Sequence, residues 1–563
     1  MGGTGAFGRR LVERLAATTD LDIIIAGRSL ERAQALADAL RPIARGNIAV
    51  AALDRDALTA AAIVELGAAI VVDAAGPFQG REPLVARAAI EARCHYIDLA
   101  DARDFVSRFP QLHDAAHGAG VTAITGASST PALSHAVLDH LTAGWRTVAR
   151  VEIAISPGNR APRGASAAKA ILSFVGKPVR VWLDGAWRNR FGWSGLQRVN
   201  VPGLGRRWLS LCETPDLDLV PARFWGVRSA SFRAGLELGV LHFGMWALGL
   251  IVRLRLIPSL VPLARPLLWI ARRFDPFGTD RGAMLVEAAG MSADGRPVVA
   301  CWRLVAAPGV GPNVPVLPAL ALIRRLAAGQ EPRPGAFAAA GLLSLNDVAR
   351  EFAPLDVATS AEAAFPQPLF ARLLGDRFGN LPAPIRALHS PVDVAEYIGE
   401  ADVEGPSNGP ARWIAAMIGF PAPGKGLPVR VEIRAGERGE IWQRKFGTIR
   451  FRSHLSQHAK SDGLTERFGP FAIVLALGAS DAGIDMKVTG WHVGPLPLPR
   501  GLAPWTIATE RAAPDGRFCF DIEIGLPLIG RLVRYHGWLV PRPVASPQPE
   551  AATSLDAASA AQR

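Results

Sequence analysis

The sequence predicts an α/β protein that begins with a Rossmann-type, doubly wound parallel sheet, continues into an α+β domain and ends in an antiparallel β-rich domain. Three observations support this prediction. A glycine motif, G-x-G-x-x-G, lies at residues 3–8. Short apolar runs then alternate with Ala-rich amphipathic stretches as far as residue 125. Beyond residue 372, period-two alternation replaces the helical period.

The glycine motif indicates a dinucleotide-binding turn. Its first glycine makes the tight turn, its second lets the backbone approach a pyrophosphate, and its third lets the helix pack on the strand. Residues 9–16 predict a helix whose amino terminus would face the phosphates. Only Met1 and Gly2 precede the motif, so the buried first strand that it normally follows is missing. We interpret this as a start codon assigned too late; the alternative is a true truncation that weakens cofactor binding.

Five apolar runs predict the other strands of the parallel sheet: residues 21–26, 47–53, 68–75, 95–100 and 121–125. Runs of this length, bounded by turn residues, suit strands that are buried on both faces.

The first run ends in Gly27-Arg28-Ser29, where an NAD site would carry an acidic residue. An arginine here, with Arg32 one turn later, can pair with a 2′-phosphate. We therefore expect NADP to be preferred over NAD. The alternative is that Arg28 is only a solvated neighbour of a helix cap.

Composition limits the class of protein. A chain of 563 residues predicts two or three domains. The four cysteines lie far apart, without a C-x-x-C pair, which argues against structural zinc and a disulfide scaffold and suits the reducing cytoplasm. The sequence contains no H-E-x-x-H motif, and we predict no metal site. It also contains no Walker loop and no Ser/His/Asp set.

An apolar, basic insert is predicted at residues 182–273. It holds 13 arginines against five acidic residues, and seven of the 14 tryptophans. Its most apolar run, residues 234–252, has the length of a membrane-spanning helix but contains Glu237 and His242. Three interpretations stay open: a membrane span, an interfacial hairpin at residues 230–273 that meets anionic lipid, or a buried helical pair that covers an apolar substrate. The long aliphatic runs argue against nucleic-acid binding.

Four motifs occur in an order that resembles the saccharopine dehydrogenase-like family, in its uncharacterised oxidoreductase branch. They are residues 3–8, 75–78 (Ala-Gly-Pro-Phe), 94–101 and 126–133. The resemblance covers about residues 1–355. It implies a Rossmann domain, then an α/β domain, with the chain returning to the first domain near its end. Residues 525–538 resemble the end of a domain of unknown function that follows such modules. Relatives in this family include lysine-pathway dehydrogenases and a trans-acting enoyl reductase of lipid and polyketide assembly.

The resemblance also implies the nucleotide contacts. Gly3, Gly5, Ala6, Phe7 and Gly8 would cradle the pyrophosphate, Arg28 and Ser29 would meet the adenosine ribose or its phosphate, Asp54 would lie near adenine, and Ala75, Gly76 and Pro77 would flank the nicotinamide ribose.

Candidate catalytic residues lie at the carboxyl end of the run at residues 95–100, where ligands bind to such sheets. They are Tyr96, Asp98 and Asp101. A general acid within reach would protonate a reduced carbon or nitrogen. Each residue also has a structural interpretation, as a core aromatic or a helix cap. Two interpretations of residues 128–130 stay open: they bind substrate, or they cap the helix that follows.

The predicted domains are residues 1–140 (Rossmann), 141–355 (substrate domain with the insert), 370–542 (β-rich) and a disordered tail at 543–563. In the β-rich domain, five aromatic residues line an apolar ligand site or form the core: Trp442, Phe446, Trp491, Trp505 and Trp538. We predict a cytoplasmic NADP-dependent oxidoreductase of a lipid-like or amino-acid-derived substrate, peripheral on the inner membrane face. The alternative is a non-catalytic, Rossmann-shaped protein that binds lipid or membrane and has lost its cofactor.

Overall fold

The computed structural model describes residues 1–162, 164–330, 333–436, 439–458, 463–494 and 496–542. The predicted disordered tail at 543–563 lies outside these residues. The described residues divide into two compact units, Met1–Ala288 with Ala300–Ala363 and Ala289–Val299 with residues 364–542. Each unit has a hydrophobic core of its own.

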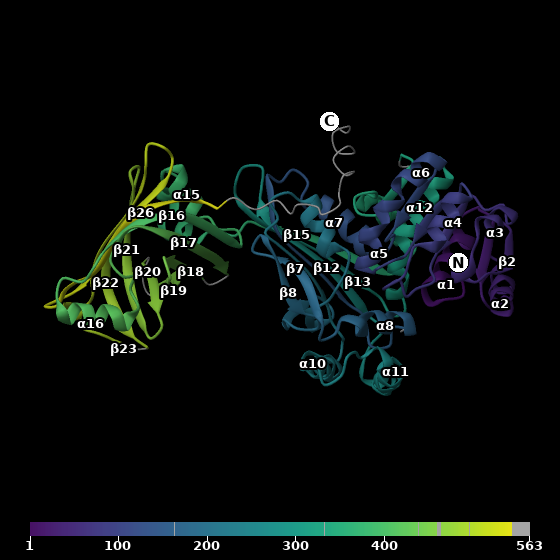
Figure 1. Cartoon of the computed structure of the whole chain (residues 1–563), viewed down its shortest axis with the longest axis horizontal. Coiled ribbons are helices and arrows are strands. Elements are labelled where there is room, and N and C mark those ends of the chain that lie inside the picture. Colours follow the sequence, from purple (N-terminus) through teal and green to yellow (C-terminus); the bar gives the residue numbers. More distant parts are fainter. Residues whose placement is uncertain (163, 331–332, 437–438, 459–462, 495, 543–563) are drawn as a thin grey trace. The chain divides into compact units, whose positions relative to one another are not determined.

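The chain begins with alternating helices and parallel strands, as the sequence predicts (Figure 1). Strands β1 and β2 pair in parallel, and β3, β4, β5 and β14 form a second parallel sheet. Strand β14 comes from far along the chain and pairs with β5, which is the return to the first domain that the resemblance implies. The elements are α1 (Ala6–Thr18), β1 (Ile23–Gly27), α2 (Leu30–Leu40), β2 (Ile48–Ala52), α3 (Ala60–Glu65), β3 (Ile70–Asp73), α4 (Leu84–Glu91), β4 (His95–Asp98), α5 (Arg103–Arg108), α6 (His113–Ala119), β5 (Thr122–Thr125), α7 (Ser134–Leu141) and β14 (Gly335–Ala338).

The single doubly wound sheet that the sequence predicts is divided, because no described strand lies between β1 and β3. Only the first residues of the chain enter this gap. The amino group of Met1 donates to the carbonyl of Val72 at 2.7 Å, and the backbone N–H of Gly3 donates to the carbonyl of Ala26 at 3.4 Å. An apolar cavity of 570 Å³ occupies the rest of the gap, between β1, β3, α1 and Ile323. We call it the strand gap.

A mixed sheet of nine strands follows the parallel region, and all of it except the ends of β12, β13 and β15 belongs to the same unit. Its main order is β15-β13-β12-β6-β11-β10-β9, and β7 pairs with both β11 and β8. The strands are β6 (Thr147–Ser156), β7 (Pro178–Leu183), β8 (Ala186–Phe191), β9 (Gln197–Val201), β10 (Gly205–Leu211), β11 (Ser229–Ala234), β12 (Gly282–Met291), β13 (Pro297–Ala306) and β15 (Val357–Ala364). Its helices are α8 (Ala165–Phe174), α9 (Asp216–Arg223), α12 (Leu317–Ala327) and α13 (Leu345–Phe352).

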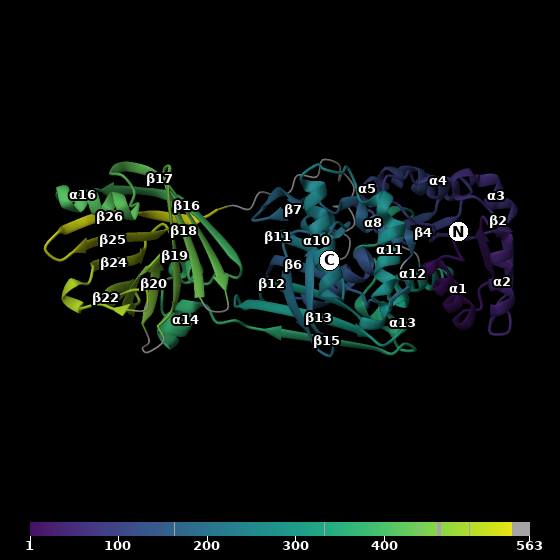
Figure 2. The ribbon, with the colours of Figure 1, turned by 90° about the horizontal axis from the view of Figure 1, so that it is seen from below.

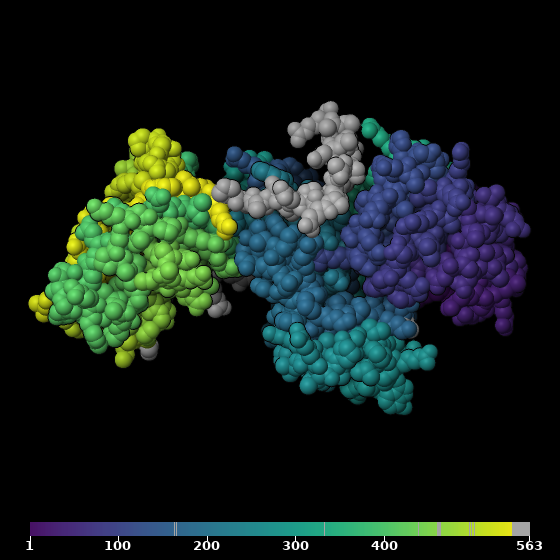
Figure 3. Space-filling model, in the orientation of Figure 1, coloured from purple at the N-terminus to yellow at the C-terminus, as the bar shows by residue number. Residues whose placement is uncertain are grey.

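Two helices project from this unit as a lobe, seen at the bottom of Figures 1 and 3. They are α10 (Gly239–Arg253) and α11 (Ala264–Arg273). This α10–α11 lobe, residues 238–278, is shorter than the insert predicted at 182–273, because β8 to β11 are strands of the mixed sheet. Among the described residues, none of the helices combines the length and the apolar composition that spanning a bilayer requires.

The second unit is an antiparallel barrel (Figure 2). Ten strands close into a ring, because β22 pairs with both β21 and β24. Trp442 and Phe446 lie in its core, whereas Trp491, Trp505 and Trp538 are partly exposed. The ring consists of β16 (Val394–Glu404), β17 (Gly424–Gly436), β18 (Gly439–Phe446), β19 (Ile449–Gln457), β20 (Leu464–Phe468), β21 (Phe471–Ser480), β22 (Gly483–Val493), β24 (Trp505–Ala512), β25 (Phe518–Leu526) and β26 (Gly530–Pro541).

Candidate active site

The glycine motif forms a compact turn at the amino terminus of α1. The backbone N–H of Gly5 donates to the carbonyl of Gly2 at 2.9 Å, and Gly5 is the N-cap of the helix. A Cβ at Gly8 would lie 2.2 Å from the carbonyl oxygen of Gly2, so only glycine fits there. No described side chain caps this helix, and Ala6 and Phe7 are exposed. The first amides of α1 are therefore available to an anion, as a pyrophosphate site requires.

The residues predicted to meet the adenosine half lie at the carboxyl ends of β1 and β2. The Arg28 side chain is exposed, and so is Arg32 in α2. Ser29 caps α2, where its hydroxyl accepts from the backbone N–H of Arg32 at 3.3 Å. Asp54 likewise accepts from the N–H of Asp56 at 3.0 Å. The two arginines therefore present positive charge beyond the carboxyl end of β1.

Arg55, which sequence reasoning missed, holds the turn after β3. Its guanidinium donates to Asp73 at 3.0 Å and to the carbonyl of Ala75 at 3.0 Å. The backbone N–H of Ala75 donates to the other oxygen of Asp73 at 2.9 Å. These bonds fix the segment of Ala75, Gly76 and Pro77.

The start of α8 joins this turn to the glycine loop. Ser166 donates to the carbonyl of Gly76 at 3.2 Å, and a Cβ at Gly164 would lie 3.9 Å from the Cβ of Ala6. The structure thus brings together the residues predicted for the pyrophosphate and the nicotinamide ribose.

Two of the three predicted catalytic residues lie in the core. Tyr96 and Asp98 are both 0 % exposed, and neither lines the large cavity described next. Burial raises the pKa of Asp98 to about 7, although it accepts hydrogen bonds from the N–H groups of Gly126 and Ala100 and from the Thr125 hydroxyl. Asp98 therefore joins the carboxyl ends of β4 and β5. The catalytic role of these two residues stays a prediction.

Asp101 differs from this pair because it is exposed, and it accepts from Gln79 at 3.2 Å. Its catalytic role also stays a prediction.

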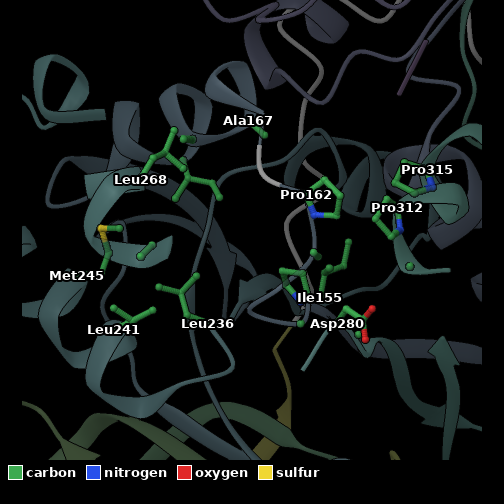
Figure 4. A pocket seen from close by; sticks show the side chains of 18 of the residues that line it. Ile155, Pro162, Ala167, Leu236, Leu241, Met245, Leu268, Asp280, Pro312 and Pro315 are labelled. Atoms are coloured by element: carbon green, nitrogen blue, oxygen red, sulfur yellow. The ribbon is translucent and has the colours of Figure 1, made fainter. Parts of the chain in front are cut away.

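An apolar cavity of 620 Å³ adjoins the glycine loop (Figure 4). Phe7 forms part of its wall, and most of the rest comes from α8, the mixed sheet, the segments 157–162 and 311–315 and the α10–α11 lobe. Only two of the described lining residues, Ser129 and Asp280, carry polar side chains. Asp280 is another residue of this site that sequence reasoning did not single out. This substrate cavity, as we call it, combines an apolar body with two points where a proton can be held.

The parallel strands, the glycine loop and the adjoining cavity define the class of protein: the chain has an NAD(P)-binding dehydrogenase fold. Residues 1–124 match the family described as the saccharopine dehydrogenase NADP binding domain. Residues 381–539 match a domain of unknown function, DUF4166. The chain therefore combines a saccharopine dehydrogenase NADP-binding domain at its amino terminus with a DUF4166 domain at its carboxyl terminus, which confirms the resemblance found in the sequence.

Solved structures show distant similarity. An apo saccharopine dehydrogenase (L-Glu forming) from Saccharomyces cerevisiae is 14% identical over 64% of this chain and 98% of its own, with a TM-score of 0.48. GenD2 from gentamicin A biosynthesis, in complex with NAD, is 16% identical over 51% of this chain and 68% of its own, with a TM-score of 0.26. A dehydrogenase from Chromobacterium violaceum is 12% identical over 52% of this chain and 69% of its own, with a TM-score of 0.25. Likeness at this level carries no information on the substrate. A search of the curated proteins found no match.

Proposed function

We propose that this protein is an NADP-dependent oxidoreductase that transfers hydride to or from a lipid-like substrate. The substrate cavity is the observation that carries the proposal. An amino-acid-derived substrate would bury an ammonium and a carboxylate there, and burying charge without partners is costly. The cavity offers one carboxylate, Asp280, and one hydroxyl, Ser129, so a mostly uncharged substrate suits it better. The proposal includes a cytoplasmic location at a membrane surface, the source of such substrates.

The residues at the glycine loop fit a dinucleotide. The free amides at the start of α1 would bind its pyrophosphate, and Ala75 with its neighbours would contact the ribose on the nicotinamide side. When bound, the cofactor supplies the hydride. Asp280 or Ser129 would hold the proton that balances the reduction. The apolar wall would exclude water from the reacting carbon.

Arg28 supports the preference for NADP. It is exposed at the carboxyl end of β1, and a charge-assisted hydrogen bond to a 2′-phosphate contributes about 1.5–3 kcal/mol. The test is the binding of NADPH and of NADH to the full chain, followed by fluorescence. We expect Arg28→Asp to weaken NADPH binding at least about tenfold while NADH binding changes little.

Arg87→Asp, an exposed arginine on α4, is the matched control for this measurement. If Arg28→Asp keeps the parent's preference for NADPH over NADH, Arg28 does not contact the 2′-phosphate.

One observation favours a second function. Most of the wall of the substrate cavity is apolar, so the cavity also suits a non-catalytic protein that binds lipid and has lost its cofactor. It predicts that neither NADPH nor NADH binds, while a fluorescent fatty acid still binds to the substrate cavity. Nucleotide binding with micromolar affinity or better would exclude it.

A further inference from the structure

The two ends of the α10–α11 lobe lie side by side. Glu237, just before the lobe, accepts from the backbone N–H of Thr279 at 2.8 Å and from its hydroxyl at 2.7 Å. The same carboxylate accepts from the N–H of Asn159 at 2.7 Å and pairs with Arg207 at 3.0 Å. The lobe is therefore an insertion whose two ends are held together beside the mixed sheet.

A buried histidine attaches α10 to the mixed sheet. His242 is 0 % exposed, its Nδ1 accepts from the backbone N–H of Leu236 at 3.3 Å, and its Nε2 lies 2.9 Å from the Ser210 hydroxyl. Burial lowers its pKa to about 4, so it is neutral at cytoplasmic pH. Glu237 and His242, the two polar residues of the apolar run at 234–252, therefore face the body of this unit. Neither of them contributes to the outer face of the lobe.

That outer face gathers exposed apolar side chains. Eight of the 25 large apolar residues that are exposed in the described chain lie in these 41 residues. Leu254 is 68 % exposed, Leu256 71 %, Trp269 60 % and Phe277 75 %. The other four are Val240, Phe243, Leu263 and Ile270. Such a concentration marks an interaction surface, because exposed apolar residues are normally scattered.

The charges of the lobe indicate the kind of partner. Its arginines are exposed at positions 253, 255, 265, 272 and 273. Its one acidic residue, Asp275, accepts from the Asn159 side chain at 3.0 Å. In the described chain Arg255, Arg265 and Arg272 form no ion pair. Arginines beside exposed leucine and tryptophan are typical of segments that lie in the headgroup region of an anionic bilayer.

The substrate cavity opens on this same surface. Val240 and Ile270 line the cavity and are also exposed, 61 % and 42 %. Leu241, Met245 and Leu268 of the two helices point into it (Figure 4). An acyl chain that leaves a bilayer at the lobe would therefore enter the cavity between α10 and α11 without crossing water.

We propose that the α10–α11 lobe docks on the surface of a bilayer containing anionic phospholipid, and that the substrate enters the cavity from that bilayer. This inference rests on the proposed function only in taking the cavity as the substrate site. The docking itself depends on the exposed apolar residues and the arginines, so it is measured without any nucleotide.

Vesicle flotation of the full chain tests the docking. We expect it to float with vesicles of phosphatidylcholine and phosphatidylglycerol, and much less with phosphatidylcholine alone or in high salt. Leu254→Ser, Leu256→Ser and Trp269→Ser together should lower partitioning at least about tenfold. Their matched control changes three residues elsewhere that are as exposed, Trp225→Ser, Trp413→Ser and Leu528→Ser, and should float like the parent.

A second set of variants tests the charges. Arg255→Gln, Arg265→Gln and Arg272→Gln together should lower partitioning about a hundredfold, since each basic residue near an anionic surface contributes about 1 kcal/mol, or about fivefold. The control removes three exposed arginines of the barrel, Arg450, Arg452 and Arg467.

Three results would overturn the docking: no flotation with any vesicle, lobe variants that float like the parent, or equal losses in the controls. A chain that floats without binding NADPH would defeat the proposed function and leave the docking intact. A chain that binds NADPH but does not float would defeat the docking and leave the proposed function intact.

Discussion

Glu237 and Thr279 are 42 residues apart in the chain, yet the carboxylate of the first accepts both the backbone N–H and the hydroxyl of the second, at 2.8 and 2.7 Å. Burial opposes the ionisation of Glu237, but the bonds from Asn159 and Thr279 and the charge of Arg207 outweigh it and hold its pKa below the ordinary value. This carboxylate fixes both ends of the α10–α11 lobe.

Glu237→Gln should therefore loosen the lobe. It leaves the guanidinium of Arg207, whose side chain is 5 % exposed, without its charge partner, and breaking such a buried pair costs about 3 kcal/mol. Urea unfolding and hydrogen exchange of residues 238–278 measure the effect. Glu287→Gln, which breaks the more exposed pair with Arg150, is the control and should cost less than about 1 kcal/mol.

The contribution of Glu237 has a defined pH dependence. Because its pKa is depressed in the folded state, its stabilisation is fully present above the unfolded value of about 4.3 and is lost as the pH falls through the folded value. The difference between parent and Glu237→Gln should be constant from about pH 5 to 7 and shrink below about pH 4. A difference that grows in acid would contradict this assignment.

An apolar strand fused before Met1 should fill the strand gap. The edges of β1 and β3 face this cavity without a strand partner among the described residues, and the buried amino group of Met1 has its pKa lowered by desolvation. An extension of about six residues that alternates Val and Ile would pair with both edges and remove the buried charge.

We expect the extension to raise the free energy of unfolding by at least about 2 kcal/mol and to tighten NADPH binding. An extension of equal length that contains two prolines is the control. Equal melting temperatures for the two proteins would show that the gap does not accept a strand.

Gly244→Phe should narrow the substrate cavity. Gly244 lines it on α10, and a Cβ added there meets no heavy atom within 4 Å, so the new ring has space to enter. We expect the affinity for a fluorescent fatty acid to fall about tenfold, with NADPH binding unchanged. Gly118→Phe on α6, where a Cβ also meets open space, is the matched control. Unchanged fatty-acid affinity in Gly244→Phe would place the acyl chain elsewhere.

Asp98→Asn separates the structural role of this carboxyl from a catalytic one. Its pKa is raised to about 7 against about 3.9 unfolded, so the folded state holds a proton that the unfolded state loses, and stability falls as the pH rises between these values. Asparagine mimics the protonated acid. Unfolding at about pH 5.5 and about pH 8 should show roughly 2 kcal/mol less pH dependence in the variant.

A variant that folds with the parent's pH dependence but has lost turnover would instead support the catalytic prediction for Asp98.

The sequence predicted the parallel strands well, because each is a short apolar run bounded by turn residues, and such runs are local signals. The barrel strands followed from period-two alternation, as at residues 518–524 in β25. The extent of the insert could not be predicted, because the arginines of β8 and β10 give these strands the same basic composition as the lobe.

The site was harder to predict for a different reason. Tyr96 and Asp98 follow one another closely on a strand that is buried on both faces, so the sequence does not tell which side chain reaches a ligand. Phe7, Ser129 and Asp280 come from distant segments, and only the fold brings them to one cavity.

The closure of the C-terminal barrel has a consequence for its use as a module. With β22 joined to both β21 and β24, every long strand of the ring has two neighbours, so the ring offers no template on which another polypeptide could polymerise. Such a unit can be appended to another domain without adding a free edge of a long strand. Whatever it recognises must meet its loops, its interior or the side chains on its outer wall.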